Sequence, residues 1–193
     1  IDHLAQTMNY DEMLTWVLFY TSIFETHRAP MVDVVDPAGL VRSQAIENTS
    51  GSLRLTLNGA ENHRTLAGRF INESFGSTVQ HIAFSTADIF ATAKALRENG
   101  FSTLRFSPNY YDDLPGRLSL DADLLDRLRA DNVLYDRDDR GEYFQLYGPT
   151  YGDGFFFEIV ERRNGYRGYG AANAPFRIAA QRRTLLPADA ARI

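Results

Sequence analysis

The sequence lacks cysteine altogether, which excludes disulfide bonds, thiolate metal sites and cysteine nucleophiles. It contains a single lysine, Lys94, and its other basic residues are arginines scattered along the chain. With a formal net charge of −5, this distribution offers no basic patch, and we expect no nucleic-acid partner. The apolar runs are far too short to span a bilayer, so we expect no membrane association. The missing cysteines fit a reducing compartment, and we expect a cytoplasmic location.

An initiator methionine and a signal peptide are also missing from the sequence. The chain starts on an apolar phrase that is typical of a strand, which favours a segment of a longer polypeptide. What the chain does have is 44% hydrophobic and 12% aromatic residues among 193, which is enough for a sizeable packed core. This composition is not that of a disordered protein.

One phrase occurs twice, as IDHLAQTM at residues 1–8 and as VQHIAFST at residues 79–86. Both copies read aliphatic, polar, His, aliphatic, Ala, and both predict a strand. The first copy is followed by helical spacing and then by three alternating segments, at about 10–24, 31–36, 40–47 and 51–58. The second copy is followed by a helix, a strand, an inserted helix, a hairpin and a last strand, at 87–100, 101–107, 118–132, 133–149 and 153–162. The repeated order predicts a duplicated βαβββ module.

The predicted fold class is therefore α+β, with two βαβββ modules. The paired modules are expected to form one domain over residues 1–163, with module boundaries at about 1–58 and 77–163. Residues 59–75 are the expected linker between the modules. Residues 164–193 are the expected C-terminal tail, which contains a helix candidate at 175–185.

Three residues on the predicted strands are candidates for holding a metal ion. Because strand residues alternate between faces, His3 and His81 point to the same side as the aliphatic and small residues two positions away. Glu158 lies in a phenylalanine-rich strand, where an unpaired carboxylate would cost roughly several kcal/mol and needs a cation, a proton or an arginine partner. Two neutral imidazoles and one carboxylate form a set that leaves coordination positions open. The spacing favours this metal site over the alternative of three ordinary hydrogen-bonded core residues.

Other polar motifs predict no site. The remaining histidines, His27 and His63, stand in polar, loop-like contexts and are expected at the surface. The phrase DRDDRG at 136–141 lacks the glutamate that closes a calcium loop, so it reads as a turn. The phrase GYRGYG does not fit the glycine pattern of a nucleotide-binding turn.

The duplicated module with its His, His and Glu resembles the vicinal-oxygen-chelate superfamily. More closely, the chain resembles the C-terminal, metal-bearing half of 4-hydroxyphenylpyruvate dioxygenase, from IDHL through VQHIAF and FFFEIVER to the tail phrase GYGAANAPF. The resemblance implies a half-open barrel around one divalent metal ion, with the helix at 175–185 as a lid. It also implies Fe(II) as the favoured ion, with Mg(II) or Mn(II) as alternatives, and a small 2-oxo acid as the substrate that binds the metal.

Carried over by motif, the metal ligands are His3, His81 and Glu158. The matching substrate-binding positions are Ser43 in VRSQAI, Asn58 in LTLNG and Gln145 in YFQLY.

Two positions depart from the family pattern. Leu66 stands where the family has a pocket glutamine, and Ala174 stands where it has a phenylalanine that stacks on the substrate ring. Such a stacking contact contributes roughly 1 kcal/mol. These departures argue against hydroxyphenylpyruvate as the substrate.

An altered tail with an intact triad resembles a bacterial fusion, in which a TIM barrel with 3-dehydroshikimate dehydratase activity precedes a dioxygenase-like half. This implies an upstream barrel in the same chain that forms protocatechuate in quinate and shikimate catabolism, and weak or no oxygenase activity in the present residues. The alternative is an active Fe(II) dioxygenase module for an aromatic or other small 2-oxo acid. In the first case the domain would be a companion that stabilises or dimerises a lyase. Whether these residues are an enzyme, and whether they form a homo-oligomer, stays open at this point.

Overall fold

The computed structural model describes residues 1–185, which form two compact units. Unit 1 comprises residues 1–84 and 150–157, together with residue 185, and unit 2 comprises residues 85–149 and 158–184. The strand β9 (Phe155–Arg163) passes from one unit into the other at the peptide bond that precedes Glu158. Within residues 1–185, none of the helices combines the length and the apolarity that crossing a membrane requires.

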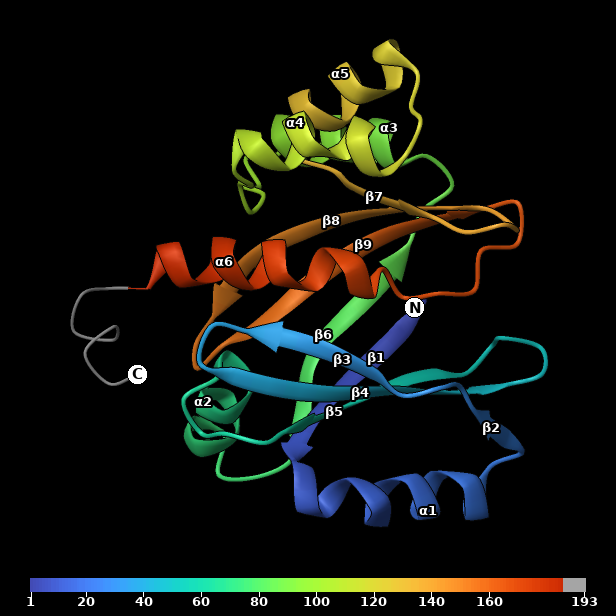
Figure 1. Cartoon of the computed structure of the whole chain (residues 1–193), viewed down its shortest axis with the longest axis vertical. Coiled ribbons are helices and arrows are strands. Elements are labelled where there is room, and N and C mark those ends of the chain that lie inside the picture. Colours follow the sequence, from blue (N-terminus) through green and yellow to red (C-terminus); the bar gives the residue numbers. More distant parts are fainter. Residues whose placement is uncertain (186–193) are drawn as a thin grey trace. The chain divides into compact units, whose positions relative to one another are not determined.

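Unit 1 is a mixed sheet with a helix packed on one face (Figure 1). Its elements are β1 (His3–Asn9), η1 (Tyr10–Glu12), α1 (Met13–Ile23), β2 (Thr26–Arg28), β3 (Val32–Asp36), β4 (Gly39–Asn48), β5 (Arg54–Ala60), α2 (Leu66–Glu73) and β6 (Thr78–Ser85). The strand order is β2-β4-β5-β1-β6, and β3 also pairs with β4. The strand β1 runs parallel to β5 and antiparallel to β6, so the strand that begins the chain lies in the interior of this sheet.

The helix predicted at 10–24 is confirmed, with its first turn formed by the 3-10 helix η1. Met13 and Val17 lie one turn apart on the side of α1 that faces β4 and β5, where they join the buried cluster of the unit. That cluster consists of Met8, Met13, Val17, Ile46, Leu55 and Leu57. This packing holds the back of the sheet, so the opposite face of β1 is the one that carries His3.

The segment 59–75 is more than the linker that the sequence predicts, because it contains the helix α2. The Thr65 hydroxyl caps this helix by accepting from the Gly68 N–H over 3.0 Å. Gly68 is needed because a Cβ at this position would collide with the backbone of Asn62 and His63. A glycine in an eight-residue helix hides the helical pattern in the sequence, while burial of Phe70 stabilises the helix in the fold.

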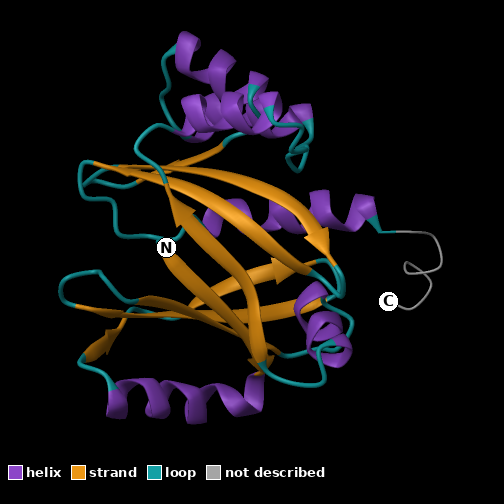
Figure 2. Cartoon of the chain, turned by 180° about the vertical axis from the view of Figure 1, so that it is seen from behind, coloured by secondary structure: helices purple, strands orange, loops and turns teal. Residues whose placement is uncertain are grey.

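Unit 2 contains most of the helices (Figure 2). Its elements are α3 (Ile89–Glu98), α4 (Pro108–Arg117), α5 (Ala122–Ala130), β7 (Leu134–Arg137), β8 (Glu142–Tyr151), the larger part of β9, η2 (Ala171–Asn173) and α6 (Ala174–Thr184). The strand order is β9-β8-β7, and β7 pairs with β8 as an antiparallel hairpin. The tail helix predicted at 175–185 is confirmed as α6.

The strand predicted at 101–107 is wrong, since this segment is irregular up to Ser107. A single backbone bond, from the Leu104 N–H to the Tyr147 carbonyl over 2.8 Å, ties it to β8. The helix α4 was not predicted because Pro108 and Pro115 are poor helix signals, although a proline in the first turn costs no hydrogen bond. Two helices are thus inserted where one was expected, and β7, β8 and β9 supply the three strands of the second module.

The α+β class with two βαβββ modules is confirmed, and the first module has the short strand β2 in addition to the three predicted strands. The division into a domain at 1–163 and a tail at 164–193 stays a prediction. Residues 186–193, which the predicted tail includes, lie outside the described part of the chain.

Candidate metal centre

The first strands of the two modules pair with each other, and their register brings His3 and His81 together. In the antiparallel pair of β1 and β6, His3 lies opposite Ala83 and His81 lies opposite Ala5. The two histidines are therefore diagonal neighbours, a separation that long side chains on one face can bridge. Because the residue opposite each imidazole is only an alanine, both rings have room to converge. Their Nε2 atoms are 3.3 Å apart.

Asp2 fixes the orientation of the His3 ring. The His3 Nδ1 atom lies 2.8 Å from Asp2 Oδ1, and both side chains are only 3% exposed. A carboxylate can only accept, so Nδ1 carries the proton and the lone pair of His3 is on Nε2, which faces His81. Asp2 is itself held by its N–H, which donates to the Ala83 carbonyl over 2.7 Å. This carboxylate–imidazole pair is the usual support of a metal-binding histidine.

An aromatic ring orients His81. Phe156 of β9 stacks on the imidazole with ring centroids 4.7 Å apart and an interplanar angle of 24°. The first residues of β9 belong to unit 1, where β9 is the neighbour of β6 in the strand order. Because strand residues alternate, Glu158 follows Phe156 on the same face of β9.

His3, His81 and Glu158 each offer one ligand atom, and these three atoms lie within 4.8 Å of one another. Among residues 1–185 this is the one group of three or more His, Asp and Glu side chains with such a geometry. An ion with bonds of about 2.1 Å holds two ligands at a right angle about 3 Å apart, which matches the 3.3 Å between the two imidazole nitrogens. The residues therefore fit a divalent metal ion.

Glu158 is 2% exposed, and within unit 2 its carboxylate is hydrogen-bonded by Gln145 and Tyr147. Its Oε1 atom accepts from Gln145 Nε2 over 2.9 Å. Tyr147 also forms a hydrogen bond with the carboxylate. Burial is the main cause that raises the pKa of the Tyr147 phenol well above its ordinary value, and the negative charge of Glu158 is the second. A phenol that stays protonated is a donor, so it supports the ionised form of Glu158.

Two of the predicted substrate-binding residues lie side by side in unit 1. Ser43 of β4 is directly opposite Asn58 of β5, and Asn58 is opposite Thr7 of β1. Thr7 is four residues from His3 along β1, so the two side chains lie on the same face of the sheet. Asn58 and Ser43, which lie beside Thr7 on the neighbouring strands, share this face. The sequence did not single out Thr7, and its pattern offered no signal beyond the strand alternation.

The third predicted substrate residue, Gln145, has its amide fully engaged within unit 2. It donates to Tyr147 and Glu158 and accepts from Asn173. Besides Thr7, the sequence did not single out Asp2, Tyr147 and Asn173. Only Asp2 left a signal, as the acidic neighbour of a candidate ligand.

The two positions that depart from the family pattern begin helices. Leu66 is the first residue of α2, and its N–H donates to Asp36 Oδ2 over 3.1 Å. Ala174 is the first residue of α6. The nearby ring of Phe176 packs edge-on against Tyr110 with centroids 4.8 Å apart, so this phenylalanine is already used within unit 2.

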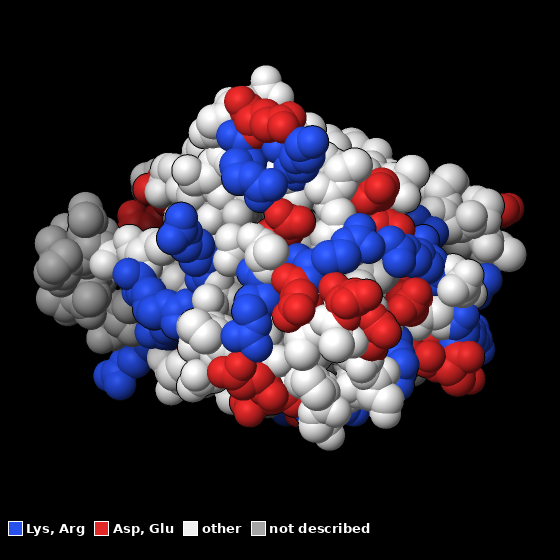
Figure 3. Space-filling view, turned by 90° about the horizontal axis from the view of Figure 1, so that it is seen from above, with Lys and Arg blue, Asp and Glu red and all other residues white. Residues whose placement is uncertain are grey.

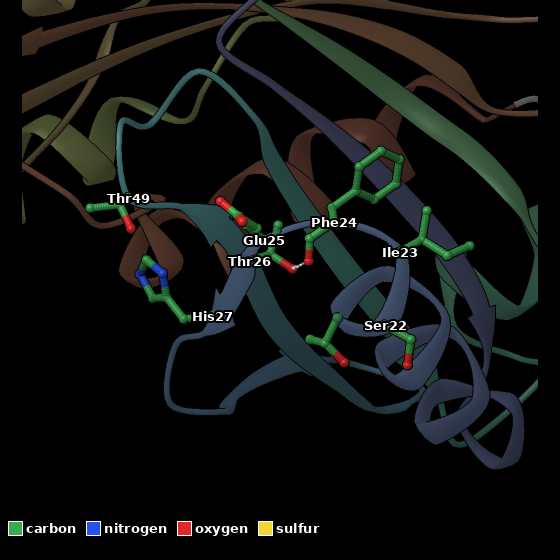
Figure 4. Close-up of a pocket in the computed structure, with 8 residues that line it drawn as sticks. Ser22, Ile23, Phe24, Glu25, Thr26, His27 and Thr49 are labelled. Atoms are coloured by element: carbon green, nitrogen blue, oxygen red, sulfur yellow. Dashed lines mark hydrogen bonds between the residues drawn. The ribbon is translucent and has the colours of Figure 1, made fainter.

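The surface of unit 1 has a cavity of about 420 Å³ where α1 meets β2, lined by residues 21–27 and Thr49. Figure 4 shows His27 and Glu25 at this cavity, which contains none of the predicted site residues. The surface positions predicted for His27 and His63 are confirmed, because both are exposed. On the face drawn in Figure 3, basic and acidic side chains lie next to one another instead of forming a large area of one sign.

Comparison with known proteins gives a family match over more than half of the chain. The family model of the Glyoxalase/Bleomycin resistance protein/Dioxygenase superfamily matches residues 1–113. The 3-dehydroshikimate dehydratase of Pseudomonas aeruginosa is 45% identical over 181 residues, which are 93% of this chain and 28% of that protein. The 4-hydroxyphenylpyruvate dioxygenase of the same species is 31% identical over 175 residues, which are 90% of this chain and 49% of that protein. The chain thus spans between about a quarter and a half of these curated relatives.

Two solved structures are similar to the chain over most of its length. A xylose isomerase-like TIM barrel/4-hydroxyphenylpyruvate dioxygenase fusion protein is 42% identical with a TM-score of 0.78, and the match covers 95% of this chain and 29% of that one. A mutant of 4-hydroxymandelate synthase from Streptomyces coelicolor is 28% identical with a TM-score of 0.86, and the match covers 95% of this chain and 53% of that one.

Proposed function

Since the chain belongs to the Glyoxalase/Bleomycin resistance protein/Dioxygenase superfamily, we propose that it is a 4-hydroxyphenylpyruvate dioxygenase-like metal-binding domain. In this proposal His3, His81 and Glu158 are the ligands of one divalent ion. The domain is the C-terminal part of a bacterial 3-dehydroshikimate dehydratase and has weak or no oxygenase activity of its own. The observation that carries the proposal is the approach of the two imidazole nitrogens to 3.3 Å with Asp2 behind His3.

The donor set favours a particular group of ions. Two neutral imidazoles and one carboxylate suit Fe(II) and other first-row ions, and this donor set would leave coordination positions open for a substrate. Fe(II) is the favoured ion, and Mn(II) or Mg(II) are the alternatives. Such an ion would act as a Lewis acid that binds two oxygens of a small oxo acid.

The protein residues have separate tasks around such an ion. Asp2 keeps the His3 ring in the tautomer that presents Nε2, and Phe156 limits rotation of the His81 ring. Gln145 directs a hydrogen bond at Glu158 and so holds its carboxylate in place. Ser43 and Asn58, which lie opposite each other on the face of His3, supply polar groups for a bound small molecule.

Weak or no oxygenase activity follows from the positions that would hold the aromatic end of a substrate. Leu66 cannot hydrogen-bond a phenol, and Ala174 has no ring to stack on it. Phe176 is packed against Tyr110 and is not free to replace the missing ring without moving. A loosely held substrate loses the near-attack geometry, which costs on the order of a hundredfold in rate.

The dehydratase assignment rests on the 45% identity to the enzyme of Pseudomonas aeruginosa, of which the chain spans 28%. We propose that a TIM barrel precedes residue 1 in the same polypeptide and carries the lyase reaction, in which 3-dehydroshikimate loses water to give protocatechuate. The similar fusion protein, which joins a xylose isomerase-like TIM barrel to a 4-hydroxyphenylpyruvate dioxygenase, supports this arrangement. A cytoplasmic location and a homo-oligomer stay predictions of the same proposal.

The second candidate function is an active Fe(II) dioxygenase for an aromatic or other small 2-oxo acid. The complete His, His, Glu set and the 31% identity to a 4-hydroxyphenylpyruvate dioxygenase favour it. In this case the lid predicted at 175–185 would close over a substrate bound at the metal. The two candidates share the metal site and differ in what the pocket holds.

Metal analysis of purified protein tests the site itself. We expect the wild-type chain to contain about one divalent ion and the His81→Ala variant to contain almost none. The matched control is His63→Ala, which removes an exposed histidine outside the site and should leave the metal content unchanged. Equal occupancy in wild type and His81→Ala would refute the assignment of the ligands.

A further inference from the structure

Two buried amide side chains connect the carboxylate of Glu158 to the C-terminal segment. Gln145 Nε2 donates to Glu158 Oε1 over 2.9 Å, and Gln145 Oε1 accepts from Asn173 Nδ2 over 2.9 Å. Both amides are 1% exposed, so water does not compete for these bonds. We infer that these two residues, here called the amide chain, orient Glu158 and thereby set the affinity for a divalent metal ion. The inference rests on the proposed metal site.

The backbone of β7 gives the amide chain its direction. The Tyr135 carbonyl can only accept, and Asn173 Nδ2 donates to it over 3.2 Å. The Tyr135 N–H can only donate, and it donates to the Tyr110 hydroxyl over 2.8 Å. The single proton of the Tyr110 hydroxyl faces two acceptors, Asn173 Oδ1 at 3.0 Å and the Tyr135 carbonyl at 3.1 Å, and in either case the oxygen of Asn173 lies on the side of Tyr110. The nitrogen of Asn173 therefore faces Gln145, and Gln145 must direct its own nitrogen at Glu158.

A reversed Gln145 amide would place its oxygen against the carboxylate. Two acceptors cannot bond, so Glu158, which is 2% exposed, would lose a donor in a buried site. Asn173 prevents this reversal because it offers only a donor to Gln145. The direction set at the β7 backbone is thus transmitted through two amides to the proposed metal ligand.

Gln145 also arranges the second donor of Glu158. Its other amide proton goes to the Tyr147 hydroxyl over 2.7 Å. The Tyr147 hydroxyl oxygen accepts this bond with one of its lone pairs. Its own proton is then directed at the Glu158 carboxylate, to which the hydroxyl is hydrogen-bonded. One glutamine therefore positions these two hydrogen bonds to Glu158, and together they direct its carboxylate.

The segment from Gly170 to Asn173 packs closely against Gln145. Gly170 has a φ of +61°, and a Cβ at this position would collide with the side-chain amide of Gln145. Asn173 follows in η2 and ends the segment just before α6. The inserted helix α4 contributes Tyr110, which secures the far end of the chain. The insertion and the tail, both outside the repeated strands, thus support the proposed ligand.

The affinity for Mn(II) alone, measured by titration calorimetry on the full chain, tests this inference. Groups that orient a metal ligand typically change the affinity by about tenfold to a hundredfold when removed, and we expect that loss for Gln145→Leu. Tyr110→Phe removes only a hydroxyl at the far end of the chain, so the expected loss is about threefold to tenfold. If Gln145→Leu does not fold, Tyr110→Phe decides the question.

The neighbouring tyrosine provides the matched control. Tyr111 is equally buried, and its hydroxyl has no hydrogen-bond partner among residues 1–185. Tyr111→Phe should therefore keep the Mn(II) affinity of the wild type. The visible spectrum of the Co(II)-loaded protein is a second readout, because a displaced carboxylate changes the ligand field while a merely looser fold does not. We expect this spectrum to change in Tyr110→Phe and not in Tyr111→Phe.

The outcomes separate the inference from the proposal beneath it. Wild-type affinity and an unchanged Co(II) spectrum in both Gln145→Leu and Tyr110→Phe would overturn the inference and leave the metal site standing. An equal loss of affinity in Tyr110→Phe and Tyr111→Phe would also overturn it, because that pattern indicates general loosening. No binding of Mn(II) by the wild type would overturn the metal site, and the inference with it.

Discussion

Removing the bound ion with a chelator is expected to lower the melting temperature of the wild-type chain by about 5–11 °C. An ion that binds only the folded state stabilises it by mass action, by about 2.7 kcal/mol at a hundredfold excess over the dissociation constant. For a chain of 193 residues, each kcal/mol changes the melting temperature by about 2–4 °C. The product of these two figures gives the expected range.

The structure explains why the binding energy should appear as folding energy. His3 and Glu158 are 3% and 2% exposed, and they are more than 150 positions apart in the sequence. An unfolded chain cannot hold two such ligands at one ion, so the site exists only in the folded state. Glu158→Gln keeps the shape of the side chain and an oxygen that can accept from Gln145, but it removes the negative ligand. The variant should therefore fold, and chelator should change its melting temperature by less than about 2 °C.

The assay is a pair of calorimetric melts, one with Mn(II) at a hundredfold excess over its dissociation constant and one with chelator. His63→Ala serves as the control that keeps the full difference between the two melts, since His63 is exposed and lies outside the ligand set. An unchanged wild-type transition would refute the reasoning, and so would a difference of the same size in Glu158→Gln.

Two further predictions concern the pocket and the acid side of the stability profile. The iron-loaded chain should consume little or no oxygen with 4-hydroxyphenylpyruvate in an oxygen electrode. The double variant Leu66→Gln, Ala174→Phe should consume oxygen faster. Brisk turnover by the unmodified chain would contradict the role given to these two positions. Hydrogen bonds from Ser77, and to a lesser extent from Asn9, lower the pKa of Glu12 below its ordinary value of 4.5. These bonds therefore stabilise the folded state at neutral pH, and this stabilisation is lost as the carboxylate is protonated in acid. Urea denaturation should therefore show Ser77→Ala to be less stable than wild type at pH 7, with a difference that shrinks below pH 4.5; an equal difference at pH 7 and pH 3 would argue against this bond.

The helices that the sequence reading missed share a cause. The helix α4 contains two prolines and α2 contains a glycine, which are residues of low helix propensity, although tertiary contacts favour a helix at both places. Conversely, the apolar residues of 101–107 suggested a strand, but this segment keeps only one backbone bond to β8 at Leu104. Local patterns predict what a segment can form, and the neighbours with which it packs decide what it does form.

Gln145 shows the same limit within the site. Its motif matched a substrate-binding position in the family, and nothing in the local sequence pointed to Glu158, which is thirteen residues away on the next strand. The pairing partners of a buried amide depend on three-dimensional neighbours such as Asn173, which belongs to the tail. Whether Gln145 also reaches a substrate stays a prediction.

The sequence by itself determined the duplicated module and the candidate ligands, because a strand shows its buried face as a period of two and the phrase around each histidine repeats. Only the tertiary structure decided that His3 lies opposite Ala83, which makes the two histidines diagonal neighbours with their Nε2 atoms 3.3 Å apart. It also decided which groups hold the ligands in place, from Asp2 behind His3 to the amide chain behind Glu158. The physical reason is that a hydrogen-bond register and a buried polar contact join residues far apart in the chain, and no local pattern encodes their distance.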